Sequence, residues 1–257
     1  MLIILFTVTA LGAALGSFLA LACQRYHPAV SPTDWFAALW TPPSQCLHCL
    51  APVLWRDRIP LISWLCLQGR CRSCHQTIGF LPLLLELLGA LLFLIVMVLF
   101  RESLIVAAFM LTASCLLLLL AAIDQREFLL PDVLTGALLW LGLSRFCFYE
   151  PLSISAAVGG AVLGYGSLWL LAWLYRQIKN QEGLGYGDIK LFAALGTWCG
   201  WQTLPWIALV ASVTALFAFL TLAVINKTLS VSSPLPFGPF LAAAGWGVMM
   251  SQSLTAL

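Results

Sequence analysis

The sequence predicts an all-helical polytopic membrane protein with about eight transmembrane helices and one small extramembrane domain inserted after the first helix. Of the 257 residues, 62% are hydrophobic and only 9% are charged, and the mean hydropathy is +1.00. One water-soluble core cannot hide that much apolar surface. The apolar residues also form separate runs of membrane-spanning length, whereas proline, arginine and paired cysteines gather in a single polar stretch.

The apolar runs are predicted to cross the bilayer as helices, because about 20 residues span its hydrocarbon core. They lack the alternation of barrel strands, and a helix satisfies its own backbone hydrogen bonds in lipid. Residues 1–22 have no basic n-region and no convincing cleavage site, so we expect a retained helix and not a signal peptide. The predicted spans, of which the sixth is short, are residues 2–22, 81–100, 104–123, 133–149, 154–175, 188–201, 205–225 and 237–254.

The distribution of basic residues predicts the orientation. Arg101 and Arg145 flank loops on one side, and the other ten of the 12 Lys and Arg residues flank loops on the opposite side. By the positive-inside rule, the opposite side is cytoplasmic. An even number of spans then puts both termini outside, in the periplasm if this is a Gram-negative inner-membrane protein. The net charge of +2 is small and spread out, which argues against nucleic acid as a partner.

Four cysteines in the polar stretch form two Cys-x-x-Cys pairs, Cys46 with Cys49 and Cys71 with Cys74. Two such knuckles can complete a tetrahedral four-sulfur shell, in which zinc is structural because no coordination site stays open. Two disulfides or free buried cysteines are the alternatives, and a reducing cytoplasm favours the metal. His48 or His75 could each replace a cysteine ligand. We therefore divide the chain into a first transmembrane helix (1–22), a cytoplasmic zinc-binding domain (23–80) and a helical membrane core (81–257).

Two aspartates lie at the ends of predicted spans, Asp124 at the end of the third and Asp188 at the start of the sixth. Glycines precede the second one, at Gly183, Gly185 and Gly187. Ionisable groups at such positions are costly and mark candidate functional sites. If the two carboxyl groups meet, one keeps its proton while the other activates water, as in an aspartic peptidase. The residues alone leave three readings open, namely this peptidase, a proton relay in a transporter, and plain interfacial helix caps.

The charged residues around these aspartates carry weaker expectations. Asp132 follows a proline and precedes the fourth span, so we expect a helix N-cap. Lys190 is expected either to act electrostatically on Asp188 or to anchor its helix at the interface. Glu86 lies one turn into the second span and is expected to pair with an arginine. A non-catalytic scaffold that docks a partner through the zinc domain is a further alternative for the whole chain.

These residues occur within a series of motifs that resembles the type 4 prepilin peptidases, the bifunctional enzymes of type IV pilus and type II secretion systems. The resemblance covers nearly the whole chain, and the order and spacing of its motifs are specific. The motifs are Gly16-Ser17-Phe18-Leu19, the paired Cys-x-x-Cys, Ile59-Pro60-Leu61-Ile62-Ser63-Trp64-Leu65, Gly69-Arg70-Cys71-Arg72, Pro82-Leu83 with Glu86-Leu87-Leu88, Ile123-Asp124, Leu130-Pro131-Asp132, Gly185-x-Gly187-Asp188 with Lys190-Leu191, and Pro236-Phe237-Gly238-Pro239.

The resemblance implies an enzyme of the bacterial inner membrane that removes the basic leader of prepilins and pseudopilins after a glycine at the cytoplasmic face. It then implies methylation of the new amino terminus with S-adenosylmethionine. Asp124 and Asp188 match the family's catalytic pair, and the four cysteines match its metal-binding domain, which is linked to methylation. The chain departs from the family at Ala20 and Arg58, where asparagine is common, and these departures bear on the methyltransferase. A proton-coupled transporter with an aspartate relay is the alternative function.

Overall fold

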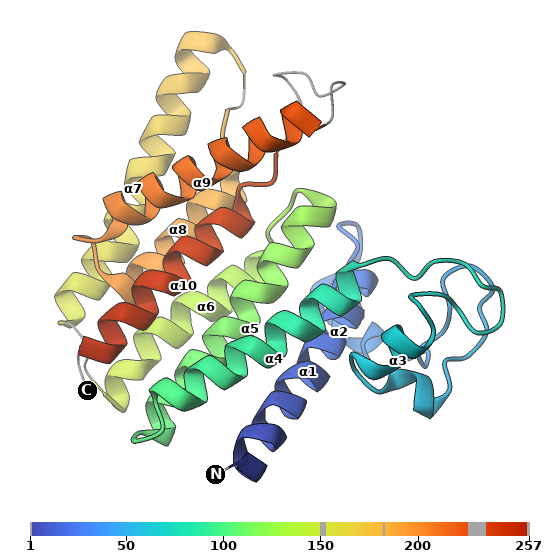
Figure 1. Cartoon of the computed structure of the whole chain (residues 1–257). Helices are drawn as coiled ribbons and strands as arrows, with labels where there is room; N and C mark the ends of the chain where they lie inside the picture. The colour runs from blue at the N-terminus through green and yellow to red at the C-terminus, as the bar shows by residue number, and fades with distance from the viewer. Residues whose placement is uncertain (1, 150–152, 182, 226–234, 256–257) are drawn as a thin grey trace. The chain divides into compact units, whose positions relative to one another are not determined.

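The computed structural model describes residues 2–149, 153–181, 183–225 and 235–255, and every named element within these ranges is a helix (Figure 1). The prediction of an all-helical chain is therefore confirmed for the described residues. The chain divides into two compact units, Met1–Leu119 and Leu120–Leu257. Each unit is described by itself below, and the predicted three-part division at residues 22 and 80 stays a prediction.

The first unit is built on a close crossing of its two long helices α1 (Leu2–Arg25) and α4 (Leu81–Leu99). Two glycines of α1 make that approach possible. A Cβ on Gly12 would lie 2.5 Å from the carbonyl oxygen of Gly89, and a Cβ on Gly16 would collide with that of Leu85. The polar segment between these helices contains only short helices, namely α2 (Pro32–Ala38), η1 (Trp55–Arg58) and α3 (Ile62–Cys66).

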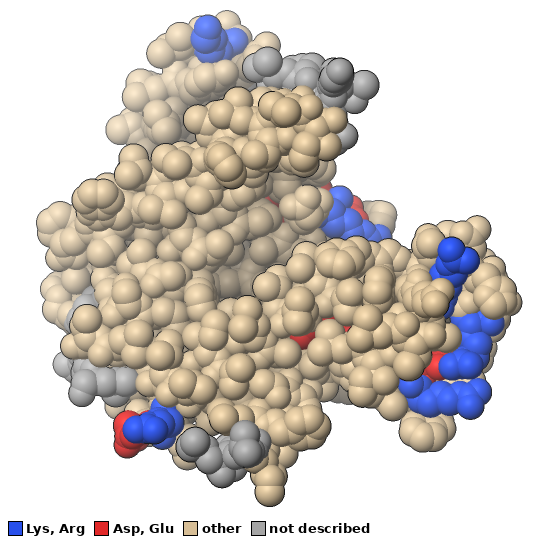
Figure 2. All heavy atoms as spheres, viewed as in Figure 1, with Lys and Arg blue, Asp and Glu red and all other residues tan. Residues whose placement is uncertain are grey.

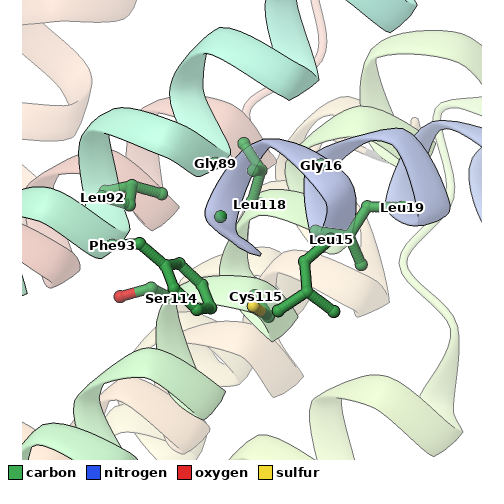
Figure 3. A pocket seen from close by; sticks show the side chains of 10 residues that line it. Leu15, Gly16, Leu19, Gly89, Leu92, Phe93, Ser114, Cys115 and Leu118 are labelled. Atoms are coloured by element: carbon green, nitrogen blue, oxygen red, sulfur yellow. The ribbon is translucent and has the colours of Figure 1, made fainter. Parts of the chain in front are cut away.

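An apolar crevice follows this crossing where α5 (Leu104–Glu127) joins α1 and α4 (Figure 3). Leu15, Phe93 and Leu118 contribute to its walls, and it has no room for a water molecule. The hydroxyl of Ser114, which also lies there, donates to the Met110 carbonyl oxygen at 2.7 Å, one turn earlier in α5. The crevice is thus a packing feature of the first unit and offers nothing to a ligand.

The second unit is organised around α8 (Tyr186–Cys199), a helix that is buried from Leu191 to Cys199. Three helices pack against it, namely α6 (Asp132–Ser144), α7 (Ile154–Lys179) and α10 (Gly238–Thr255). The long helix α9 (Leu204–Ile225) follows α8 and packs mainly on α10. From Leu191 to Cys199 this helix is apolar on every face apart from Thr197, so its neighbours enclose it.

The contact between α7 and α8 depends on a pair of facing glycines, Gly160 and Gly196. A Cβ on either glycine would collide with the backbone carbonyl of the other. We expect Gly160→Ala to lower the stability of the second unit by about 1–3 kcal/mol, because the two helices must move apart. Gly166→Ala on the same helix is the control, since a Cβ there meets nothing within 4 Å. The two melting temperatures in detergent test this, and equal values would contradict it.

Two side chains donate hydrogen bonds to backbone carbonyl oxygens at the buried C-terminal end of α8. The guanidinium of Arg145, in the short helix η2 (Arg145–Cys147), donates to the carbonyl oxygen of Trp198 at 2.8 Å and lies over its indole ring. The amide of Gln252 on α10 donates to the Cys199 carbonyl oxygen at 2.9 Å. These are the last carbonyls of a helix, which lack partners within it. Arg145 is only 1% exposed, a burial that its predicted position beside a loop did not indicate.

Within the described parts of the chain, five helices are long and apolar enough to cross a membrane, namely α1, α4, α5, α7 and α9. Their many exposed apolar side chains fit lipid contact, since a soluble surface rarely shows large apolar patches. Figure 2 shows that few charged residues lie on the face in view, with Lys and Arg gathered mainly over the cysteine-containing segment. The helices α6, α8 and α10 have 13, 14 and 18 residues and are not among these five. The total of eight spans stays a prediction.

Candidate active site and metal centre

Asp124 lies in the last turn of α5, which continues to Glu127, so it does not end the helix as predicted. Its side chain is 5% exposed. The backbone N–H of Gly238 donates to its Oδ2 at 2.8 Å. Gly238 opens α10, and the amino-terminal end of a helix stabilises a carboxylate through its free N–H groups and its dipole. The buried carboxylate of Asp124 therefore has a backbone hydrogen-bond donor at the start of α10.

Asp188 lies in the first turn of α8, which begins two residues before it, at Tyr186. The N–H of Asp188 donates to the carbonyl oxygen of Gly185 at 3.1 Å. Its Oδ1 is enclosed and has no hydrogen-bond partner among the described residues. A Cβ on Gly185 would lie 3.2 Å from Oδ2, so this glycine leaves room beside the carboxyl group. A buried polar atom without a partner is unusual and indicates a place for a ligand or water.

The structure places these two aspartates near each other within the second unit. The negative charge of Asp124 acts electrostatically on the carboxyl group of Asp188, which requires the two groups to lie near each other. The packing between Gly187 and Leu130 helps to bring them together, because a Cβ on Gly187 would lie 2.8 Å from the Leu130 Cβ. Leu130 follows α5, and Gly187 precedes Asp188 in α8. Two carboxyl groups held together in a largely dry site share protons unequally, which is the electrostatic requirement for an acid and a base.

Gly238 contacts the carboxyl group of Asp124 directly, which the sequence pattern did not show. A Cβ at this position would lie 2.7 Å from Oδ2 of Asp124, closer than real Cβ atoms approach an oxygen. We expect Gly238→Ala to shift the Asp124 carboxyl group and to lower the rate of peptide cleavage by about 100-fold. Gly247→Ala is the control on the same helix, because a Cβ there meets nothing within 4 Å. Equal cleavage by both variants would show that the Gly238 contact does not matter.

Lys190 and Asp132 pair with each other beside this site. The Nζ of Lys190 lies 2.6 Å from Oδ1 of Asp132, and both side chains are exposed. Lys190 thus has a direct partner other than Asp188, and its two predicted roles both stay predictions. Asp132 is the first residue of α6, with Pro131 in the cap position, so its prediction as the N-cap was wrong. The pair joins the starts of α6 and α8, and an exposed pair of this kind stabilises by about 0–1 kcal/mol.

The two Cys-x-x-Cys pairs of the first unit form two equivalent knuckles. In each knuckle the first cysteine accepts a backbone hydrogen bond from the residue four positions later, Leu50 or His75. Both of these residues have φ of 57°, a left-handed conformation that tightens the turn. An isolated β-bridge closes each knuckle, between residues 45 and 52 and between residues 70 and 77. His75 thus occupies a turn position equivalent to that of Leu50, and the four sulfurs form the cluster without it.

The four cysteine sulfurs converge on one point, with all Sγ atoms within 4.8 Å of one another. The Sγ of Cys46 lies 3.8 Å from that of Cys74, and the Sγ of Cys49 lies 3.9 Å from that of Cys71. A tetrahedral zinc ion with Zn–S bonds of about 2.3 Å requires sulfurs about 3.8 Å apart. A disulfide requires about 2.05 Å, and all four cysteines are free thiols. The donor set and its spacing therefore fit zinc.

The electrostatics of the cysteine cluster favour a bound cation. The backbone N–H groups of Cys49 and His48 lower the pKa of the Cys46 thiol to about 6. Those of Cys74 and Ser73 similarly lower the pKa of Cys71. The pKa of Cys74 is raised to about 12, because burial and the three neighbouring sulfurs outweigh the N–H of Gln76. Four thiolates therefore cannot coexist alone, and a divalent cation would remove that conflict.

Two polar contacts hold the segment around the knuckles. The guanidinium of Arg72, inside the second knuckle, binds both carboxylate oxygens of Asp57 at 2.9 and 2.6 Å. This contact lowers the pKa of Asp57. The Oε2 of Glu86 on α4 accepts the backbone N–H of Leu61 at 2.7 Å. Leu61 has a φ of 61°, so Glu86 supports a strained turn at the start of α3, and the expected pairing of Glu86 with an arginine was wrong.

Comparison with known proteins identifies the family of this chain. Residues 110–220 match the model of the type IV leader peptidase family, and residues 10–100 match that of the bacterial peptidase A24 N-terminal domain. The chain is 44% identical to a prepilin leader peptidase/N-methyltransferase of Dickeya chrysanthemi over 86% of its own length and 78% of the relative's. The chain belongs to this peptidase family. The predicted resemblance is thus confirmed.

Other prepilin leader peptidase/N-methyltransferases match the chain over more of its length. That of Pectobacterium carotovorum subsp. carotovorum is 40% identical over 94% of this chain and 91% of the relative. That of Stutzerimonas stutzeri is 38% identical over 96% and 90%. No solved structure matches the chain. Membership of the family, together with five apolar helices, fits a multi-pass inner-membrane protein, and nothing in these matches supports a transporter.

Proposed function

We propose that this chain removes the leader of prepilins or pseudopilins by a reaction in which Asp124 and Asp188 are the catalytic pair, and that it then methylates the new amino terminus. The observation that supports the proposal is the electrostatic effect of Asp124 on the carboxyl group of Asp188, which requires the two carboxyl groups to lie near each other in the second unit. The curated relatives are named for both activities.

The local contacts suggest a division of labour between the two aspartates. The Gly238 N–H stabilises the charged form of Asp124, so this carboxylate is suited to take a proton from water. Asp188 has an enclosed oxygen without a partner, so it is suited to hold the shared proton. Its proton would hydrogen-bond to the scissile carbonyl oxygen while water attacks the carbon. Collapse of the tetrahedral intermediate would break the C–N bond as the departing amine takes up the proton that Asp124 removed from water.

The four cysteines are proposed to hold a structural zinc ion. All four positions of a tetrahedral ion would be filled by Cys46, Cys49, Cys71 and Cys74, so the ion would have no open site for catalysis. Its role would be to stabilise a polar segment with few buried apolar side chains. S-adenosylmethionine would supply the methyl group for the second activity.

The active site is proposed to face the cytoplasm. The sorting of basic residues supports this orientation, and the burial of Arg145 strengthens it, because only Arg101 then counts on the opposite side. The cysteine cluster would lie in the same reducing compartment, where free thiolates persist. The starts of α6 and α8 carry Asp132 and Lys190, so the entrance to the site would be charged.

A single assay tests the proposed function. The purified protein in detergent is incubated with a prepilin that carries a basic leader and a Gly-Phe junction, with and without S-adenosylmethionine, and the products are analysed by mass spectrometry. Loss of the leader, plus one methyl group when the donor is present, is expected. A substrate that stays intact under conditions in which a known family member cuts it would overturn the proposal.

A further inference from the structure

The connection of residues 128–131 joins α5 to α6 beside the proposed catalytic pair. At its start, the backbone N–H of Phe128 donates to the carbonyl oxygen of Asp124 at 2.9 Å, so these residues are one helical turn apart. One turn of an α-helix rises about 5.4 Å. An extended polypeptide rises about 3.3 Å per residue and covers that distance in about two residues. A substrate that lies extended across Asp124 can therefore bring a side chain close to the scissile bond against Phe128.

Two large apolar residues of this connection are exposed. Phe128 and Leu129 are 51% and 46% exposed, whereas the next residue, Leu130, is buried and lies against Gly187. The contact of Leu130 holds the connection next to the start of α8, which carries Asp188. Connections between helices usually consist of small or polar residues, because these suit turns and water. The connection thus places exposed apolar side chains beside the two carboxyl groups.

The backbone of Phe128 has a conformation that its residue type disfavours. Its φ is 55°, in the left-handed region, where a bulky side chain crowds the backbone. Two other helices of the second unit end at a residue with positive φ, and each has a residue type that accepts it. These are Asn180 after α7, with φ of 50°, and Gly200 after α8, with φ of 74°. Among the described helix ends of this unit, the strained aromatic residue therefore occurs at the one next to Asp124, and such strain collects at functional sites.

The chemistry of the two exposed side chains indicates which part of the substrate they would contact. The leader of the proposed substrate is basic, and Phe128 and Leu129 offer it no carboxylate. An apolar side chain on the other side of the scissile bond is the better match, because contact removes apolar surface from water on both partners. A side chain that only anchored the connection in the membrane interface would need no particular backbone conformation, so lipid contact gives no reason for the strain at Phe128.

We propose that Phe128, together with Leu129, forms the subsite that binds the apolar side chain of the first residue after the scissile bond. The inference rests on the proposed function, since it adds a residue that selects the substrate to the proposed cleavage reaction. Phe128 takes no part in proton transfer. A substrate side chain held in this subsite would keep the scissile carbonyl group in register with Asp124 and Asp188, and correct positioning of this kind accelerates a reaction.

Cleavage kinetics of the full-length protein in detergent test the proposal, with two prepilins that differ only in the first residue after the scissile bond, phenylalanine or alanine. The wild type is expected to prefer the phenylalanine substrate by about tenfold or more in kcat/KM. Phe128→Ala removes the ring and keeps the strained backbone, whereas Phe128→Asn removes the ring and relieves the strain. Both variants should lose about tenfold in kcat/KM on the phenylalanine substrate, mainly through KM, and no more than about twofold on the alanine substrate.

Two further measurements control this experiment. Phe217→Ala is the matched variant, because Phe217 on α9 is also an exposed phenylalanine of the second unit, at 69%. It should change kcat/KM on either substrate by less than about twofold, because its ring lies outside the proposed subsite. The melting temperature of Phe128→Asn should equal or exceed that of the wild type, since asparagine accepts a left-handed conformation. A loss of selectivity in a protein of undiminished stability cannot come from misfolding.

Three results would overturn the inference. The first is wild-type preference for the phenylalanine substrate in both Phe128 variants. The second is an equal loss on both substrates, which would make Phe128 a general support of the site. The third is a loss that occurs only in phosphatidylglycerol vesicles and on both substrates, which would make Phe128 a lipid anchor. A wild type that cuts neither prepilin would overturn the proposed peptidase, whereas a wild type that cuts both without preference would overturn only this inference.

Discussion

Replacement of Asp124 or Asp188 by asparagine is expected to abolish leader cleavage, with a fall in rate of at least about 10³-fold. Asparagine keeps the shape of the side chain but can neither take a proton from water nor hold the shared one. The Asp124→Asn amide can still accept the Gly238 N–H, so the helix packing should survive. Quantitative mass spectrometry of the released leader over time is the measurement, together with the amount of each variant in the membrane.

Asp132→Asn is the matched control for both variants. Asp132 is also an aspartate near the start of a helix, and its partner Lys190 lies two residues after Asp188. Its carboxylate is exposed, so its removal should change the cleavage rate by no more than about twofold, as expected for an exposed ion pair. Cleavage at the wild-type rate by either active-site variant would show that the proposed dyad is wrong. A loss in Asp132→Asn as large as theirs would show that any charge change at this face disturbs the enzyme.

Removal of the proposed zinc ion is expected to unfold the polar segment of the first unit. A structural zinc contributes an apparent binding free energy of about 10–16 kcal/mol in zinc-finger peptides, and this segment has few other sources of stability. Cys46→Ser and Cys71→Ser should each reduce bound zinc from about one ion per chain to almost none. Elemental analysis of the purified variants measures the metal. Limited proteolysis between α1 and α4 measures the unfolding.

Cys66→Ser is the control for the cysteine variants. Cys66 ends α3 in the same segment, is exposed and is not part of the four-sulfur cluster. It should keep its zinc and its resistance to protease. Full zinc content in both Cys46→Ser and Cys71→Ser would show that the four sulfurs do not form the metal site. Protease resistance in zinc-free protein would show that hydrogen bonds such as Arg72 to Asp57 suffice to hold the segment.

The contacts within the candidate site show where sequence reasoning reached its limit. The sequence singled out Asp124 and Asp188 because isolated carboxylates at the ends of apolar runs are costly, a property that can be read locally. It did not show that the N–H of Gly238 binds Asp124, because these residues are 114 positions apart. The sequence motifs also did not indicate Arg145, whose guanidinium donates hydrogen bonds to carbonyl oxygens at the C-terminal end of α8, the helix that carries Asp188. A motif states which residues occur, and it does not state which backbone groups need partners.

The sequence by itself determined the class of protein, the four-cysteine pattern and the helical character of the chain, because composition and short spacings follow from neighbouring residues. It also identified the family. Only the tertiary structure decided that α8 is enclosed, that α5 and α10 meet at Asp124, and that Glu86 holds Leu61 instead of an arginine. The physical reason is the same in each case. These contacts depend on how closely helices approach, and that distance is set by glycines such as Gly160 and Gly238, whose partners lie far away in the sequence.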